Sequence, residues 1–398
     1  MTNFNLKIEA NRHFNGELST LFSVLEAEKA QGFHQRLPGY QPTPLHDLKD
    51  LAKEFSLEKI LVKDESYRFG LNAFKMLGGV YAIARLLCDE FTLDIDAFDF
   101  DKLQTHIKQK LTFATATDGN HGRGVAWAAQ QLGQHAVVYM PKGAAEERVK
   151  NIRALGAECI VTDLNYDETV RLVVELSTNN GWKVVQDTAW EGYSEIPTWI
   201  MQGYSTMAAE AIQQITEQGI AKPTHVILQA GVGAMAGGVL GFLAEKLGAN
   251  NLKTIIVEPE KADCIYRSGV SEKGEIINVG GELDTIMVGL ACGEPNPLGW
   301  QVLRNCATHF VSCEDRLAAL GMRVLANPTG DDPRIISGES GAIGTGLLAG
   351  IYYSENKQVL MKQLELGADS VVLVISTEGN TDPVHYRDVV WRGKHATV

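Results

Sequence analysis

Short apolar runs rich in β-branched residues alternate with segments of helical periodicity along most of the chain. Strands that are apolar on both faces are typical of parallel sheets covered by helices on both sides. Nine strands are many for one twisted sheet, so the pattern predicts an α/β protein with two open, twisted, mainly parallel sheets. The predicted strands are KILVKD, TFATATD, AVVYMP, ECIVTD, KVVQD, HVILQAG, TIIVEP, HFVSCE and SVVLVIS.

The alternation shows no internal repeat and no low-complexity linker, so we expect two domains that exchange strands rather than follow one another. The prediction is a large domain of residues 1–70 and 190–398 and a small domain of residues 71–189. A ligand site is expected in the cleft between them. The predicted helices cover residues 74–89, 122–132, 146–155, 166–177, 201–214, 236–247 and 315–325.

Composition and charge narrow the class of protein. The 398 residues are 45% hydrophobic and 21% charged, which is typical of folded proteins and argues against disorder or a fibre. The net charge of −13 would repel a phosphate backbone, so nucleic acid is not an expected partner. The N-terminal segment MTNFNLKIEANRHF lacks the apolar core of a signal peptide, which favours the cytoplasm.

One apolar stretch, residues 226–244, approaches the length that spans a membrane. Its glycines fall where the run VILQAG would turn through GVGAM into a helix, so we predict a buried strand, loop and helix and no membrane contact. Six cysteines in so long a chain do not form a disulfide framework, and no two are spaced as CxxC. No metal site is predicted.

Three loops follow predicted strands at their carboxyl ends, where open α/β sheets bind ligands. The first, in SYRFGLNAFKMLGG, places Lys75 near the start of a helix, where the positive end of the helix dipole disfavours an ammonium group. Burial beside Phe74 and Met76 would lower the pKa of the amine further. A neutral amine is what a Schiff-base nucleophile requires, although an ordinary surface lysine on an amphipathic helix is the alternative.

The other two loops are rich in glycine. TATDGNHGRG, at residues 115–124, leaves backbone N–H groups available for an anion such as a carboxylate, or forms an Asp-Gly turn capped by Asn120 and His121. QAGVGAMAGG, at residues 229–238, favours a phosphate at a helix start. The acidic Glu258 after the next strand leaves NAD open beside another phosphate cofactor.

Together these loops resemble the fold type II enzymes that depend on pyridoxal phosphate (PLP), the group of the threonine and serine dehydratases and the tryptophan synthase β-subunit. QPTPL, the Lys75 segment, TDGNHG, GVGAM and STEGN follow one another in the family's order, between Gln41 and Gly379. The resemblance implies PLP as the cofactor, bound by the large domain in the interdomain cleft, and Lys75 as the lysine that carries it as a Schiff base.

The resemblance also implies further contacts. Asn120 is expected at the 3-oxygen of the ring and Thr377 at the pyridine nitrogen, with Ser376 in its place if the alignment slips by one. Glu339 is either a cofactor contact or a helix-capping carboxylate. The other implied cofactor contacts are Phe74, Gly231, Val232, Gly233, Ala234 and Met235, and the implied substrate contacts are Thr117, Asp118, Gly119, His121 and Asp187.

Three features resemble one branch of the family, the ammonia-lyases that act on 2,3-diaminopropionate. Asp118 stands where the family usually has serine, Asp187 lies in VVQDTAWEGYSEIP, and the ending STEGNTDPVHYRDVVWRGKHA is long and distinctive. The resemblance implies an α,β-elimination that yields pyruvate and two ammonia. Lys75 would be the base for the L form and Asp118 for the D form, and Asp187 would hold a substrate ammonium.

Other readings remain open at this level. A serine/threonine dehydratase or a D-cysteine desulfhydrase would share the cofactor motifs, and an NAD-dependent oxidoreductase or a non-catalytic PLP-binding protein would belong to another class. Family members are commonly homodimers, so a homodimer is expected. Cys264 and Cys292 either pair or stay free, and free thiols are usual in a cytoplasmic chain.

Overall fold

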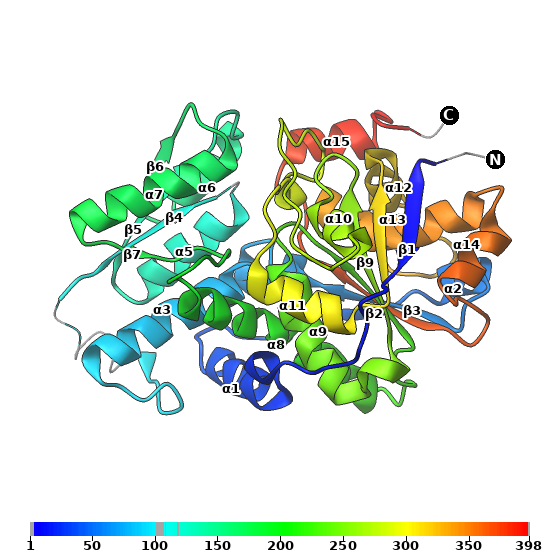
Figure 1. Cartoon of the computed structure of the whole chain (residues 1–398), viewed down its shortest axis with the longest axis horizontal. Helices are drawn as coiled ribbons and strands as arrows, with labels where there is room; N and C mark the ends of the chain where they lie inside the picture. The colour runs from blue at the N-terminus through cyan, green and yellow to red at the C-terminus, as the bar shows by residue number, and fades with distance from the viewer. Residues whose placement is uncertain (1–3, 101–106, 108, 118, 397–398) are drawn as a thin grey trace.

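The computed structural model of the chain describes residues 4–100, 107, 109–117 and 119–396. Two sheets lie side by side, with the smaller one on the left of Figure 1 and the larger one on the right. The large sheet has the order β1-β10-β9-β8-β11-β3-β2, and the small sheet has the order β6-β5-β4-β7. The strands are β1 (Leu6–Ala10), β2 (Leu45–Asp47), β3 (Lys59–Asp64), β4 (Thr112–Ala116), β5 (His135–Met140), β6 (Glu158–Val161), β7 (Lys183–Val184), β8 (His225–Gln229), β9 (Lys253–Pro259), β10 (His309–Cys313) and β11 (Val371–Ser376).

The predicted α/β class with two mainly parallel sheets is confirmed. All neighbouring strands are parallel except the edge pairs β1 with β10 and β2 with β3. The nine predicted strands are all present. The two edge strands were missed because β2 has only three residues and β1 buries a single side chain, so neither forms a long apolar run.

Helices cover both faces of the large sheet, and alternate strand residues enter two separate cores. Leu61 and Leu373 face one core with α1, α3, α8, α9 and α11, whereas Ile60 and Val372 face the other with α2, α12, α13 and α15. The helices are α1 (Val24–Gln35), α2 (Lys49–Phe55), α3 (Met76–Phe91), α5 (Asn120–Gln131), α6 (Glu146–Arg153), α7 (Tyr166–Asn180), α8 (Glu195–Glu217), α9 (Ala234–Leu247), α10 (Cys264–Val270), α11 (Pro297–Cys306), α12 (Asp315–Ala326), α13 (Glu339–Tyr353), α14 (Lys357–Gln363) and α15 (Pro383–Val390).

The strands of the small sheet all lie within the predicted small domain, and those of the large sheet all lie within the predicted large domain. The small sheet uses residues 112–184, and the large sheet uses residues 6–64 and 225–376. One continuous core joins them, because α3 packs against both α5 and α8. The exact limits of the two domains stay a prediction.

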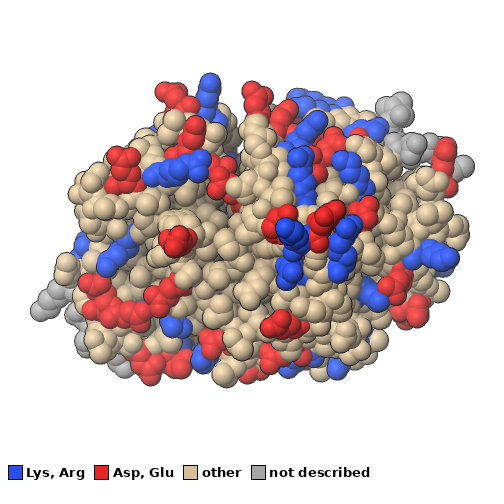
Figure 2. Space-filling model, viewed as in Figure 1, with Lys and Arg blue, Asp and Glu red and all other residues tan. Residues whose placement is uncertain are grey.

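Several other sequence-based expectations meet the structure here. Residues 226–244 form β8, a turn and α9, and within the described ranges no helix is long and apolar enough to cross a membrane. Cys264 and Cys292 are thiols and are not joined by a disulfide. On the face drawn in Figure 2, acidic and basic side chains are interspersed. Among the described side chains, no group of three or more His, Cys, Asp or Glu is placed to hold a metal ion.

Candidate active site

A cavity of about 880 Å³ opens where strands of both sheets end. Thr117 follows β4, Gly231 follows β8 and Thr377 follows β11, so each sheet supplies loops from the carboxyl ends of its strands. The predicted position of the site, in the cleft between the sheets, agrees with this cavity. Its lining includes Phe74, Lys75, Thr117, Asn120, His121, Tyr166, Asp187, residues 229–236 and 278–283, Ser340, Thr377 and Glu378.

Lys75 lies at the start of α3, as the spacing of its segment predicts. It is the N-cap residue of the helix, and its Nζ donates a hydrogen bond of 2.5 Å to Asp187 Oδ2. Burial alone would raise the pKa of Asp187, but the positive charge of Lys75 and the nearby His121 outweigh it and lower the pKa to about 2. The cavity therefore holds an amine and an ionised carboxylate in direct contact.

Asn120 begins α5 and reaches across the cavity to the segment that follows β11 of the large sheet. Its Nδ2 donates a 2.5 Å hydrogen bond to Glu378 Oε2, and Glu378 Oε1 accepts the N–H of Ser340. Glu378 was not among the predicted site residues, although it stands next to Thr377 in the STEGN motif. A charged residue two positions after a buried strand was the signal that could have found it.

Thr377, rather than Ser376, faces the cavity. Its Oγ1 accepts a 2.9 Å hydrogen bond from Gln229 Nε2, whereas Ser376 Oγ donates to Ser337 Oγ and is not part of the lining. Gln229 is a second residue that the sequence reasoning missed. Among the described residues, Gln229 Oε1 and Ser340 Oγ are buried and have no hydrogen-bond partner, so two polar atoms of this cavity are left for a ligand.

The glycine loop after β8 brings backbone close to the cavity at the start of α9. Gly233 has a left-handed backbone with φ of +86°, and a Cβ on Gly231 would lie 3.2 Å from Cys292 Sγ. A larger residue at either position would therefore strain or crowd the loop. The first N–H groups of α9 lack partners within the helix, and a phosphate group is a natural partner for them.

The remaining predicted residues are divided between the cavity and its surroundings. Thr117 Oγ1 accepts the N–H groups of Gly119 and Gly122, which shapes the turn into α5, and Gly119 itself is not part of the lining. Glu339 begins α13 and pairs with Arg148 at 3.5 Å, outside the lining. Asp118 lies outside the residues that the structure describes.

Comparison with known proteins then identifies the family. Residues 36–378 match the family described as pyridoxal-phosphate dependent enzymes. The chain belongs to this family. PLP is accordingly its cofactor, as the sequence motifs predict. Over 398 residues the chain is 66% identical to the diaminopropionate ammonia-lyase of Escherichia coli K12, covering 100% of this chain and 99% of that protein.

Two solved structures extend the comparison. The Escherichia coli diaminopropionate ammonia-lyase, solved with an aminoacrylate-PLP azomethine reaction intermediate, has a TM-score of 0.95 and 64% identity and covers 100% of both chains. A threonine deaminase from Solanum lycopersicum has a TM-score of 0.74 at 20% identity over 98% of both chains, which supports the shared fold. The predicted resemblance to PLP-dependent ammonia-lyases of fold type II is thereby confirmed.

The residues in the cavity fit PLP. An amine that could hold an aldehyde is present at Lys75, the start of α9 suits a phosphate, and buried polar atoms at Gln229 and Ser340 await partners. The cavity is also large enough for a cofactor together with a small amino acid. Chemistry and space therefore agree with the family.

Proposed function

We propose that the chain catalyses α,β-elimination of 2,3-diaminopropionate, in its D and L forms, in which the β-amino group leaves as ammonia and hydrolysis with one water then gives pyruvate and a second ammonia. The observation that carries the proposal is the contact of the Lys75 amine with the Asp187 carboxylate inside a cavity suited to PLP. The similarity to the Escherichia coli diaminopropionate ammonia-lyase supports the choice of substrate.

Lys75 is the residue proposed to hold the cofactor and to move protons. When bound, PLP supplies an electron sink for the charge that develops at the substrate Cα. Once the substrate amine has replaced Lys75, the freed Nζ can take the Cα proton of the L substrate. The protonated Lys75 can then donate that proton to the β-amino group, because ammonia leaves more readily than an amide ion.

Asp187 is proposed to bind one ammonium group of the substrate. While Lys75 is paired with it, the pKa of Asp187 is held at about 2 and its carboxylate is ionised at neutral pH. Release of Lys75 from the pair would leave an acceptor for the additional positive charge that distinguishes a diamino acid from serine. Tyr166 OH, 3.5 Å from Asp187 Oδ1, can keep the carboxylate oriented during that exchange.

The other proposed roles follow the family motifs. Asn120 would contact the 3-oxygen of the ring, Thr377 the pyridine nitrogen, and the loop at residues 231–235 the phosphate. Thr117 and His121 would receive the substrate carboxylate, with Gly119 shaping the turn beside them, Phe74 would pack beside the cofactor, and Glu339, outside the lining, would act from its surroundings. A homodimer in the cytoplasm completes the proposal.

One experiment tests the central assignment. The purified protein is treated with borohydride and digested, and the peptide that carries reduced PLP is identified by mass; the expected label is on Lys75. Pyruvate and ammonia are then measured with both enantiomers of diaminopropionate and of serine. A label on another lysine, or activity with serine alone, would contradict the proposal, and the second result would favour a serine dehydratase.

The proposed base for the D substrate has its own test. Asp118→Asn keeps the size of the side chain and removes its charge, so we expect a loss of about 100-fold or more in kcat with D-diaminopropionate. The loss with the L form should be much smaller, because Lys75 acts on that substrate. Equal losses with the two enantiomers would reject the assignment of two bases.

A further inference from the structure

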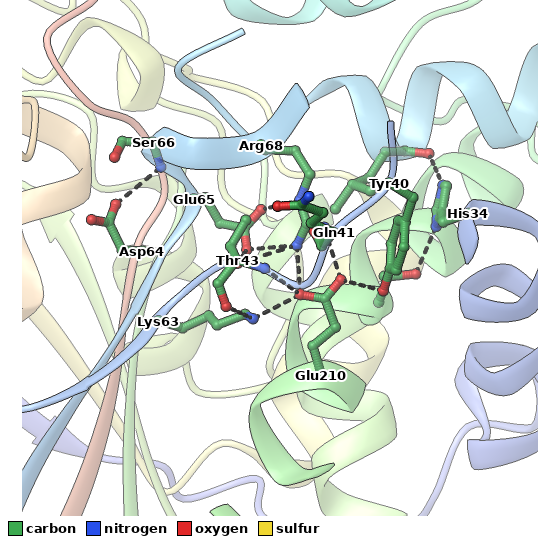
Figure 3. Close-up of polar contacts among 12 residues, drawn as sticks. His34, Tyr40, Gln41, Thr43, Lys63, Asp64, Glu65, Ser66, Arg68 and Glu210 are labelled. Carbon is green, nitrogen blue, oxygen red and sulfur yellow. Dashed lines mark hydrogen bonds and ion pairs between the residues drawn. The ribbon is translucent and has the colours of Figure 1, made fainter. Parts of the chain in front are cut away.

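A buried ion cluster lies at the start of the segment that leads from β3 to Lys75, and Figure 3 shows its side chains. It consists of Lys63, Glu65, Arg68 and Glu210, and we call it the Arg68 cluster. The side chains of these residues are at most 1% exposed. Arg68 donates to both oxygens of Glu65 and, at 2.8 Å, to both oxygens of Glu210. Lys63 Nζ donates to Glu210 at 2.7 Å.

The QPTPL motif closes this cluster. Thr43 Oγ1 donates to Glu65 at 2.7 Å, its N–H donates to Glu210, and its carbonyl oxygen accepts from Lys63 Nζ. Tyr40 OH donates a further hydrogen bond to Glu210 at 2.7 Å. The cluster thus ties residues 40–43 to β3 and α8, which are distant from one another in the sequence.

None of the four charged residues lines the cavity, so the Arg68 cluster is not placed to contact a ligand there. Apolar side chains of the same volume often stabilise a fold as well as a buried ion cluster does. Stability alone is therefore a weak account of four buried charges here. A requirement for one fixed backbone geometry explains the buried charges better. The neighbouring segment, residues 68–75, has such a requirement.

Arg68 lies at the start of the turn that precedes Lys75. In that turn Phe69, Gly70 and Asn72 have positive φ values of 48°, 69° and 58°, and two of them are not glycine. Left-handed backbone of this kind persists where the surroundings over-determine it. The far end of the turn is held by Phe74 N–H on the Thr377 carbonyl at 3.1 Å and by Gly379 N–H on the Asn72 carbonyl at 3.0 Å.

We infer that Arg68 is a positioning residue for Lys75. Its hydrogen bonds to Glu65 and Glu210 hold the residue at which the left-handed turn begins, and this fixes where the Lys75 amine enters the cavity. The inference rests on the proposed role of Lys75 as the cofactor lysine. Arg68 acts through the backbone between residues 68 and 75. A lysine at position 68 would keep the positive charge, but its single ammonium group could not make the paired hydrogen bonds by which the planar guanidinium binds two carboxylates.

The test compares Arg68→Lys and Glu210→Gln with the natural protein. PLP is removed from the full chain, added back, and the visible absorbance band is followed in time and with pH. Because displacement of a reacting group by about 1 Å can cost about 100-fold in rate, we expect the band to form about 10- to 100-fold more slowly in both variants. We also expect a larger change in kcat than in KM.

Asp332→Asn is the matched control. Asp332 is a buried carboxylate that accepts the N–H groups of Asp50 and Leu51 at the start of α2, far from Lys75 in the fold. Its replacement should lower stability and leave the rate of band formation within about twofold of the natural rate. If Arg68→Lys and Glu210→Gln lower stability but form the band at the natural rate and with the natural pH midpoint, Arg68 is only structural and the inference is wrong.

Smaller changes keep the test decisive if Arg68→Lys does not fold. Tyr40→Phe and Thr43→Val each remove one hydroxyl from the cluster, and each should slow band formation by about 2- to 10-fold, in line with the loss of one hydrogen bond to a charged group. Natural rates in both would overturn the inference. Borohydride labelling of the natural protein separates the two proposals, since a label away from Lys75 would defeat the proposed function itself.

Discussion

Two of the buried sites at which a carboxylate meets a basic side chain, the Arg68 cluster and the pair of Lys75 with Asp187, differ in how fully the carboxylate is paired. In the Arg68 cluster, Glu210 accepts hydrogen bonds from Arg68, Lys63, Tyr40 and the Thr43 N–H, all within 3.2 Å. In the cavity, Asp187 Oδ2 has Lys75 at 2.5 Å, while Oδ1 has hydroxyl and amide donors only at 3.5 Å.

This difference separates a fixed structural element from a site that can exchange partners. A saturated carboxylate loses strong hydrogen bonds when any partner leaves, so the Arg68 cluster favours one geometry. Within the described ranges, the one side-chain hydrogen bond of Asp187 shorter than 3.5 Å comes from Lys75, the amine that the proposed reaction must free. Among the described residues, the cavity also keeps unpartnered polar atoms at Gln229 and Ser340, whereas the four charged residues of the cluster contribute none.

The largest expected effect comes from removing the exchangeable partner. Lys75→Ala should lower kcat/KM with diaminopropionate by at least about 1,000-fold, since the proposed cofactor link and proton transfers are lost together. The visible absorbance band should disappear, while the far-ultraviolet circular dichroism stays that of the natural protein. Lys183→Ala, which removes an exposed lysine paired with Glu90, is the control and should keep nearly full activity. Loss of less than tenfold in Lys75→Ala would show that the cavity reaction does not depend on this amine.

An intermediate effect, on stability, is expected when acid protonates Glu210 in the Arg68 cluster. Burial raises the pKa of Glu210, but Arg68 and Lys63 outweigh it and lower the pKa to about 2. Because the folded-state pKa lies below that of the unfolded chain, the stability that Glu210 contributes is complete above about pH 4.3 and is lost as the pH falls towards 2.

Urea unfolding at several pH values measures this contribution. Between about pH 4.3 and 2, the free energy of unfolding should fall less steeply in Glu210→Gln than in the natural protein. Glu365→Gln serves as the control, because Glu365 is exposed beside Lys253 and solvent screens that pair. Parallel pH dependences for Glu210→Gln and the natural protein would mean that the cluster does not hold Glu210 ionised.

The parts of the molecule that the sequence predicts well are encoded locally. A buried parallel strand such as β11 is a continuous apolar run, and the loop GVGAM needs glycine because Gly231 and Gly233 have no room or backbone freedom for a larger residue. Lys75 is predictable because its helix start and its motif are contiguous. Short edge strands such as β2 escape, since three residues carry too little periodicity.

The Arg68 cluster could not be predicted, because its members are distributed over the fold. Lys63 and Glu210 are 147 residues apart, and each alone reads as an exposed polar residue at the end of a strand or on a long helix. Only the packing of β3 against α8 makes them partners. Glu378 escaped for another reason: its neighbour Thr377 accounted for the motif, and nothing in the sequence links Glu378 to Asn120.

The smallest predicted effect distinguishes two adjacent hydroxyls at the carboxyl end of β11, of which Thr377 lines the cavity and Ser376 does not. Thr377→Val removes the acceptor of the Gln229 hydrogen bond, although Gln229 Nε2 keeps the Ile375 carbonyl at 3.0 Å. The loss should cost about 1 kcal/mol and, since Thr377 lines the cavity, should lower kcat by about 5- to 10-fold and shift the visible band.

Ser376→Ala is its matched control, because Ser376 Oγ donates to Ser337 and lies away from the cavity. It should cost a similar free energy of unfolding while the visible band and kcat stay natural. A shifted band in Ser376→Ala, with a natural one in Thr377→Val, would mean that the serine faces the cofactor. In that case PLP would lie closer to Ser376, and the unpaired polar atoms of Gln229 and Ser340 would no longer be evidence for a ligand beside Thr377. The contrast with the fully hydrogen-bonded Arg68 cluster would then depend on Asp187 alone.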